Sequence, residues 1–236
     1  MISIVKWKQP IFNILTHAAR LAANELHPVW LIALSAAVST IRITVMQNVL
    51  ALLKKGWTVL VRRVRTQGVN TTIVWLYGRG MPALTGSPLL QYSEVTPHLY
   101  VGPQFRAPGK RMLQARGINA CVNMRIEHDD AALGLALERY LHLPTIDDDA
   151  PSLEHFEQGV AFIREVIAEG GKVYIHCGAG VGRAPSMAAA YLMAEGHSLE
   201  EAIALIRKPR PFIAITPPQM QQLRKLEAHY QTQDIP

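Results

Sequence analysis

The sequence predicts an α/β domain, with a central mixed sheet flanked by helices, preceded by a mainly helical N-terminal extension. From residue 86 onward, short apolar runs typical of buried strands alternate with segments of helical period. Before residue 86 the chain is basic and carries two long apolar runs, 28–41 and 43–53. Since 49% of the residues are hydrophobic and 18% are charged, wholesale disorder is excluded. We therefore predict an extension over 1–85 and an α/β domain over 86–236.

Charge is concentrated in the extension. Residues 1–80 contain ten Lys/Arg and one acid, Glu25, so they carry +9 while the whole chain carries +6 and the remainder about −3. Arg42 would cost roughly 3 kcal/mol at the centre of a spanning helix, so a single membrane helix over 28–53 is marginal. Basic amphipathic helices on an anionic membrane surface, bound through residues 1–80, fit this bias better.

The localisation expected from this pattern is the cytoplasmic side of a membrane, peripheral or anchored by one helix. A soluble cytoplasmic protein, with the extension as a helical subdomain, is the alternative. Residues 1–24 are basic without acids and would suit an organellar transit peptide in a eukaryotic source. Nucleic acid is not an expected partner, because the basic residues lie among apolar runs without a recognition-helix pattern.

The elements of the α/β domain follow from its apolar runs and breakers. Strands are predicted at 95–101, 118–124 and 140–144, with a helix at 110–116 between the first two. An acidic turn over residues 147–151 comes next, and Ser152 then caps a helix. The apolar face of that helix has a helical period and comprises Leu153, Phe156, Val160, Ile163, Val166 and Ile167.

The remaining boundaries are set by glycines and capping residues. Gly170 and Gly171 end the helix, and residues 172–176 form the next strand. Ser198 with Glu201 predicts a capping box, and Thr216-Pro217 with Gln219 repeats that pattern. Both therefore mark the starts of helices near the C-terminus.

The segment YIHCGAGVGRAPS, residues 174–186, carries the chemistry. A strand that enters a glycine-rich turn and opens a helix is suited to bind an anion. It is not a nucleotide P-loop, because Gly182 is followed by Arg183-Ala184, and it lacks the glycine spacing of a dinucleotide fingerprint. What remains is Cys177, five residues and Arg183. The predicted phosphate-binding residues are Gly178, Ala179, Gly180, Val181, Gly182 and Arg183.

This spacing suits cleavage of a phosphate ester. Convergent amides and the helix dipole would lower the pKa of Cys177 and make its thiolate a nucleophile. Arg183 can grip two phosphate oxygens with its planar guanidinium. His176 is predicted to orient and polarise the loop, with a satisfied histidine at a strand end as the alternative.

The motif resembles the cysteine-dependent protein tyrosine phosphatase superfamily, in particular its dual-specificity branch, whose signature is His-Cys, five residues and Arg. The resemblance covers about 92–230 and includes SEVTPHLYVGPQ, GINACVNMRIEH and SLEEAIALIRKPRPFIAITPPQ. The segment LPTIDDDAPSLEHFEQGVAFI is similar to the mitochondrial lipid phosphatase of this superfamily. Arg183-Ala184-Pro185 is similar to the phosphatases of regenerating liver and some glucan phosphatases.

The resemblance implies a general acid upstream of the loop, because an alkoxide is a poor leaving group. Alignment through Pro144 favours Asp147, with Asp148 as the runner-up; the triplet completed by Asp149 also reads as a solvated turn. The reaction is expected to proceed through a cysteinyl-phosphate that water hydrolyses, without a metal or a cofactor.

Ala184 departs from the family, whose usual Ser or Thr donates a hydrogen bond to the departing sulfur, so the second step is expected to be slow. Ser186, two positions along the helix, should point elsewhere. Cys121, in an apolar strand, is expected to be an inert core thiol rather than a partner of Cys177.

Three functions remain open from the sequence. The first is a protein tyrosine or dual-specificity phosphatase acting on phosphorylated proteins. The second is a phospholipid-phosphate phosphatase of the phosphatidylglycerophosphate type at a membrane. The third is a slow phosphatase that serves mainly as a phosphate-dependent binding protein. The loop adds no lysine or second arginine, which argues against multiply phosphorylated inositols but leaves a singly phosphorylated lipid open.

Overall fold

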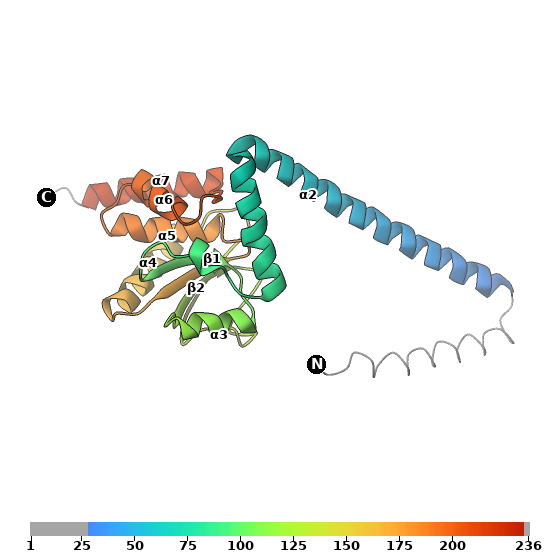
Figure 1. The fold of residues 1–236 in the computed structure, drawn as a ribbon, viewed down its shortest axis with the longest axis horizontal. Helices are drawn as coiled ribbons and strands as arrows, with labels where there is room; N and C mark the ends of the chain where they lie inside the picture. Colours follow the sequence, from blue (N-terminus) through green and yellow to red (C-terminus); the bar gives the residue numbers. More distant parts are fainter. Residues whose placement is uncertain (1–27, 234–236) are drawn as a thin grey trace. The chain divides into compact units, whose positions relative to one another are not determined.

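The structure, a computed structural model, describes residues 28–233 (Figure 1). The first part of the predicted extension, with the basic segment 1–24, lies outside the described residues. In chain order the elements are α2 (Pro28–Thr85), the 3-10 helix η2 (Leu90–Tyr92), β1 (Leu99–Pro103), α3 (Ala107–Ala115), β2 (Ala120–Arg125), β3 (Arg139–Thr145), α4 (Leu153–Ala168), β4 (Val173–Cys177), α5 (Arg183–Ala194), α6 (Leu199–Arg207) and α7 (Pro217–Gln233).

The chain divides into two compact units, residues 1–62 and 63–236. Helix α2 runs through this division and is kinked at Gly68, whose φ of 82° is not helical. Within the second unit the C-terminal part of α2 packs on the α/β domain. There Arg63 Nη1 donates to the Phe212 carbonyl at 3.2 Å, and Gln67 Nε2 donates to the Ile213 carbonyl at 3.2 Å. The division at 62/63 therefore precedes the boundary predicted at 85/86.

The extension is helical as predicted from residue 28 onward. Within residues 28–233, none of the helices combines the length and the apolar character that crossing a membrane requires.

Four parallel strands form one sheet in the order β1-β4-β2-β3. The α/β prediction with flanking helices is confirmed, but these four strands are parallel rather than mixed. Antiparallel pairing is limited in residues 28–233 to an isolated bridge between Glu94 and Tyr100. Parallel pairing requires crossover connections of roughly a dozen residues or more. Helix α3, the segment 126–138 and helix α4 provide these connections.

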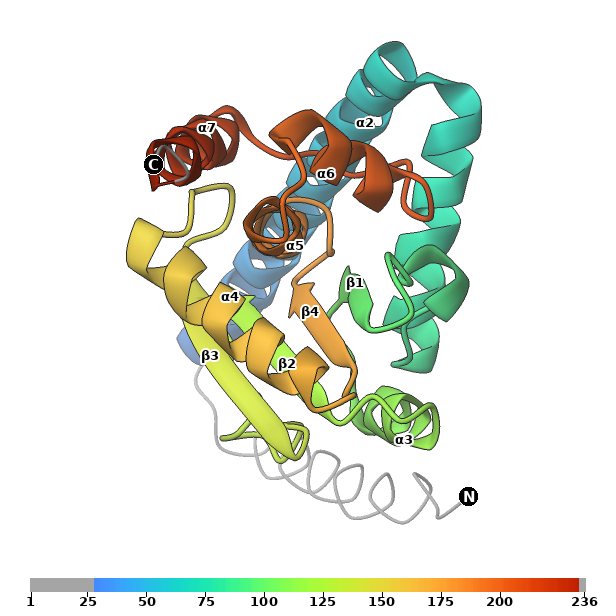
Figure 2. The ribbon, with the colours of Figure 1, turned by 90° about the vertical axis from the view of Figure 1, so that its left-hand side faces the viewer.

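Successive strand residues point to opposite faces of the sheet and fill two cores. Val122 and Ile175 belong to the larger core, which α4, α5, α6 and α7 complete. Cys121 and Tyr174 belong to the smaller core on the side of α3. Figure 2 shows α5 between α4 on one side and α6 on the other.

Of the three predicted helix caps, two form and the third forms only in part. The Ser152 side chain accepts from the His155 amide at the start of α4, and Ser198 with Glu201 makes a full capping box at α6. The Thr216 amide donates to Gln219 Oε1, but the Thr216 hydroxyl donates to the Asp148 carbonyl instead of completing a box. That last contact ties the start of α7 to the acidic turn.

Candidate active site

The loop 178–182 joins the end of β4 to the start of α5. Cys177, the last residue of β4, is 3% exposed, and the Gly180 amide donates to its Sγ at 3.3 Å. Gly180 has a φ of 65°, and a Cβ there would lie 2.3 Å from the Gly102 carbonyl carbon of β1. The loop therefore depends on glycine at position 180, because its backbone is both left-handed and in close contact with β1.

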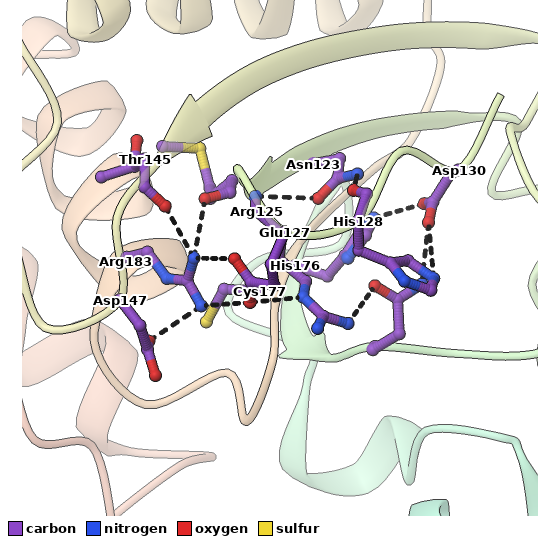
Figure 3. A network of polar contacts seen from close by, with 12 residues as sticks. Asn123, Arg125, Glu127, His128, Asp130, Thr145, Asp147, His176, Cys177 and Arg183 are labelled. Carbon is purple, nitrogen blue, oxygen red and sulfur yellow. Dashed lines mark hydrogen bonds and ion pairs between the residues drawn. The ribbon is translucent and has the colours of Figure 1, made fainter. Parts of the chain in front are cut away.

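Arg183 begins α5, and its side chain is 1% exposed (Figure 3). Its Nη1 donates to the Thr145 carbonyl at 2.7 Å and to the Met124 carbonyl at 3.3 Å. Its Nη1 and Nη2 also form a bidentate pair with Glu127, with both distances at 3.0 Å. Among the described residues, the buried Arg183 Nε has no hydrogen-bond partner. The guanidinium is thus fixed through one edge, while Nε remains able to donate to a ligand.

Glu127 was not identified from the sequence. The hydrogen bonds from Arg183, and secondarily from Arg125, lower the pKa of Glu127 to about 2 against the opposing effect of burial. Glu127 lies just beyond the carboxyl end of β2, where polar residues of parallel sheets commonly gather at a site. That position is the signal that could have drawn attention to it.

The acidic turn places its three carboxyl groups differently. Asp147 Oδ1 lies 2.8 Å from Arg183 Nη2, although the Asp147 side chain is 77% exposed. Asp148, the runner-up, has a φ of 63°, and its carbonyl accepts from the Thr216 hydroxyl. Asp149 Oδ1 accepts from the Ala150 amide, and its carbonyl accepts from Gln219. The structure thus brings Asp147 to the loop arginine, and its role as the acid stays a prediction.

Arg210 lies outside the loop but binds it, and sequence reasoning missed this residue. Its Nε donates to the Gly180 carbonyl at 2.6 Å, its Nη2 to the Ala179 carbonyl at 3.1 Å and its Nη1 to the Tyr92 carbonyl at 2.8 Å. The residue is 2% exposed, and burial lowers its pKa to about 10. By binding two loop carbonyls, Arg210 holds the peptide groups in a fixed orientation. Position 210 lies 30 residues beyond Gly180, so no local pattern indicates the contact.

His176 is fully buried and points to the face opposite that of Cys177, since neighbouring strand residues alternate. Its ring stacks with Tyr174 and meets Phe105 edge-on. His176 Nε2 lies 2.8 Å from Asp130 Oδ2. Burial raises the pKa of Asp130, but His176 and Gln104 outweigh this effect and leave the pKa below its usual value. Within residues 28–233, however, neither ring nitrogen of His176 has a partner in hydrogen-bond geometry. The orienting role and the alternative of a satisfied histidine both stay predictions, and because the ring faces away from Cys177, an effect on catalysis would pass through the backbone of Cys177.

Cys121 lies on the side of α3, opposite Tyr174 in the register of β2 and β4. Cys177 is three positions beyond Tyr174, which is roughly 10 Å along a strand. Burial raises the pKa of the Cys121 thiol to about 12, as expected for an inert core thiol. Potential ligand atoms of Cys121, Asp130 and His176 lie within 4.8 Å of one another. Two of these atoms, Asp130 Oδ2 and His176 Nε2, already lie 2.8 Å from each other.

Ala184 is fully buried in the larger core. The Ser186 hydroxyl donates to the Gly182 carbonyl at 3.0 Å, one turn back in the helix. Ser186 is therefore directed at the backbone, as its position in the helix predicted.

Comparison with known proteins agrees with this geometry. Residues 99–229 match the family "Dual specificity phosphatase, catalytic domain". Dual specificity phosphatase 28 of Mus musculus is 32% identical over 147 residues, which cover 61% of this chain and 88% of that protein. Dual specificity protein phosphatase 1 of Homo sapiens is 31% identical over 163 residues, 68% of this chain. This chain spans only 41% of the length of that second relative.

Solved structures show the same fold. PTPMT1 in complex with PI(5)P has a TM-score of 0.54 at 27% identity, covering 59% of this chain and 96% of that one. Human DUSP28 has a TM-score of 0.54 at 27% identity, covering 60% of this chain and 99% of that one. The chain therefore belongs to the dual specificity phosphatase family.

Proposed function

We propose that this chain is a cysteine-dependent phosphatase that acts on phosphorylated proteins, at phosphotyrosine and at phosphoserine or phosphothreonine, with Cys177 as the nucleophile. The observation that supports this most is the joint position of a buried thiol and a buried arginine at the two ends of one loop. Arg183 is fixed by Glu127 and two carbonyls, while its Nε has no partner within residues 28–233. A dianionic phosphate over the loop would supply that partner.

In the first step, the Cys177 thiolate attacks phosphorus and the bond from phosphorus to the leaving oxygen breaks. Protonated Asp147 gives its proton to that oxygen, so that an alcohol or phenol leaves. The loop amides and Arg183 stabilise the charge on the equatorial oxygens. Before this step the phosphate oxygens displace the Asp147 carboxylate from Arg183 Nη2, and the released carboxylate takes up a proton from solvent. Asp147 then faces the leaving group in its protonated form.

In the second step, the Asp147 carboxylate takes a proton from water, whose oxygen attacks phosphorus. The bond from phosphorus to sulfur breaks and the thiolate returns. At position 184 the buried methyl group of alanine offers no hydrogen bond to the departing sulfur. This step is therefore expected to limit turnover.

A singly phosphorylated lipid is the second candidate substrate. One structural neighbour, PTPMT1, was crystallised in complex with PI(5)P, a lipid whose ring carries one phosphate monoester. The loop positions Gly178, Ala179 and Val181 add no charge, so the site favours one phosphate group rather than several. The basic extension favours a substrate at an anionic surface.

The third candidate, a slow phosphatase used for binding, rests on Ala184. A human tyrosine phosphatase-like serine/threonine/tyrosine-interacting protein shares the fold, with a TM-score of 0.52 at 27% identity. Its name shows that proteins of this fold include phosphatase-like interacting proteins.

Phosphate release from phosphotyrosine and phosphothreonine peptides, compared with release from phosphatidylglycerophosphate vesicles, separates the first two candidates. The proposal predicts a higher kcat/KM on the peptides and no release by Cys177→Ser on any substrate. A higher kcat/KM on the vesicles would replace it with the lipid function. Retained binding and retained biological effect of Cys177→Ser would favour the third candidate.

A further inference from the structure

Helix α2 has two chemically distinct sides between residues 44 and 62. Residues three or four positions apart share one side of a helix. The apolar row is Met46, Leu50, Leu53, Trp57 and Leu60. The polar row is Thr44, Gln47, Lys54, Thr58 and Arg62. Over the whole length of α2, apolar and polar residues do not separate onto two sides of the helix; they do so within residues 44–62.

Four of the five residues of the apolar row are exposed, and Leu60 is half-buried. Met46 is 59% exposed, Leu50 48%, Leu53 64% and Trp57 67%. Val45, next to this row, is 56% exposed. A contiguous row of large exposed apolar side chains indicates a surface that binds a protein partner or a membrane. Single exposed apolar side chains are common on proteins, whereas contiguous rows of them are rare.

The charge of α2 indicates what binds there. Residues 28–85 contain no Asp or Glu, while the polar side of the 44–62 stretch contributes Lys54 and Arg62. A second copy of the helix would bring basic residues together with no acidic partner on α2, whereas paired helices normally align opposite charges beside their apolar seam. An anionic lipid surface accepts apolar side chains at the acyl boundary and attracts basic residues to its headgroups.

We propose that residues 44–62 of α2 lie on an anionic lipid bilayer, with Met46, Leu50, Leu53 and Trp57 inserted and the basic side chains at the headgroups. The helix lies in the plane of the surface and does not span it. This proposal does not depend on whether the active site takes a protein or a lipid phosphate.

Flotation of the full chain with vesicles tests the docking face. The vesicles contain phosphatidylcholine with phosphatidylglycerol, or phosphatidylcholine alone. Leu50→Gln/Leu53→Gln removes the apolar row at its centre, and Thr44→Gln/Thr58→Gln is the matched control on the polar side. Wild type and control are expected to float with the anionic vesicles, and the apolar-row variant is expected to partition at least tenfold less.

Lys54→Gln/Arg62→Gln tests the charge. Each basic residue near an anionic surface contributes about a fivefold factor in partitioning, so this variant should lose roughly 25-fold at low salt. The loss should shrink as salt rises, because salt screens the wild-type attraction. Hydrolysis of p-nitrophenyl phosphate without vesicles should be unchanged in every variant, which verifies that the catalytic unit is folded.

Three results would overturn the proposal. The first is that the full chain does not float with anionic vesicles. The second is that the apolar-row and control variants float equally, which would assign binding to another segment. The third is that sedimentation shows a dimer that Leu50→Gln/Leu53→Gln dissociates, without any vesicle binding. The last would identify the face as a contact between two copies.

Discussion

Gly180→Ala should inactivate the enzyme while leaving the domain folded. A methyl group at this position would lie 2.3 Å from the Gly102 carbonyl carbon, 2.4 Å from its oxygen and 2.7 Å from Arg210 Nη2. Ordinary contact needs about 3.5 Å, so the loop must move by about 1 Å. The left-handed backbone adds about 1 to 2 kcal/mol for alanine.

A displacement of this size between nucleophile and substrate costs about 100-fold in rate, or about 2.7 kcal/mol of transition-state stabilisation. We expect kcat/KM for p-nitrophenyl phosphate to fall at least that far, and the free energy of unfolding to fall by about 2 to 4 kcal/mol. Steady-state kinetics and thermal unfolding followed by circular dichroism measure the two effects.

Gly178→Ala is the matched control in the same loop. A methyl group there would meet only Arg183 Nη2 within 4 Å, at 3.7 Å, which is ordinary contact. Its kcat/KM should stay within about threefold of wild type. Equal activity of Gly180→Ala and Gly178→Ala would refute the account of the loop geometry.

Four further predictions follow from the site. Arg210→Met leaves buried carbonyls of the loop without a donor, so kcat/KM should fall about 100-fold, with Arg210→Lys intermediate; wild-type kinetics of Arg210→Met would contradict the loop-positioning role. Asp147→Asn should lower kcat on alkyl phosphates about 100- to 1000-fold and on p-nitrophenyl phosphate much less, because the alkoxide is the poorer leaving group and needs the proton. If Asp148→Asn shows this pattern instead, Asp148 is the acid. Since the pKa of Glu127 is lowered to about 2, its carboxylate stabilises the fold fully above about pH 4.5 and loses this effect as the pH falls toward 2. In Glu127→Gln, the free energy of unfolding should therefore change less with pH between about 4.5 and 2. An unchanged slope in this range would count against the ion pair with Arg183. Ala184→Ser should raise steady-state turnover and shrink the burst of product, as stopped-flow kinetics will show, whereas unchanged turnover would mean that the second step is not limiting.

Local patterns in the sequence predicted the loop and most elements, although β1 covers Leu99–Pro103 rather than 95–101 and α3 begins at Ala107 rather than at residue 110. Ser198 with Glu201 predicted the start of α6, and the helical period of Phe156, Val160 and Ile163 predicted the buried face of α4. Leu153, assigned to the same face, is 39% exposed, because it lies at the helix start beyond the core. The spacing of Cys177 and Arg183 likewise encodes a local turn, which the structure shows as a loop between β4 and α5.

Contacts between segments distant in the sequence could not be predicted from such local patterns. Glu127 meets Arg183 across 56 residues, and Arg210 meets Tyr92 across 118. Asp130 lies against His176 only because β2 and β4 are neighbours in the sheet. No spacing rule links such pairs, since the sheet order that joins them depends on the packing of the whole domain.

Trapping the phosphoenzyme tests most directly whether Cys177 is the nucleophile. The full chain is mixed with p-nitrophenyl phosphate, quenched in acid during the burst and digested for mass spectrometry. We expect a phosphate adduct on Cys177 that approaches one per chain, because Ala184 slows its hydrolysis, and no adduct in Cys177→Ser. A phosphate on another residue, or substrate turnover by Cys177→Ser, would contradict it.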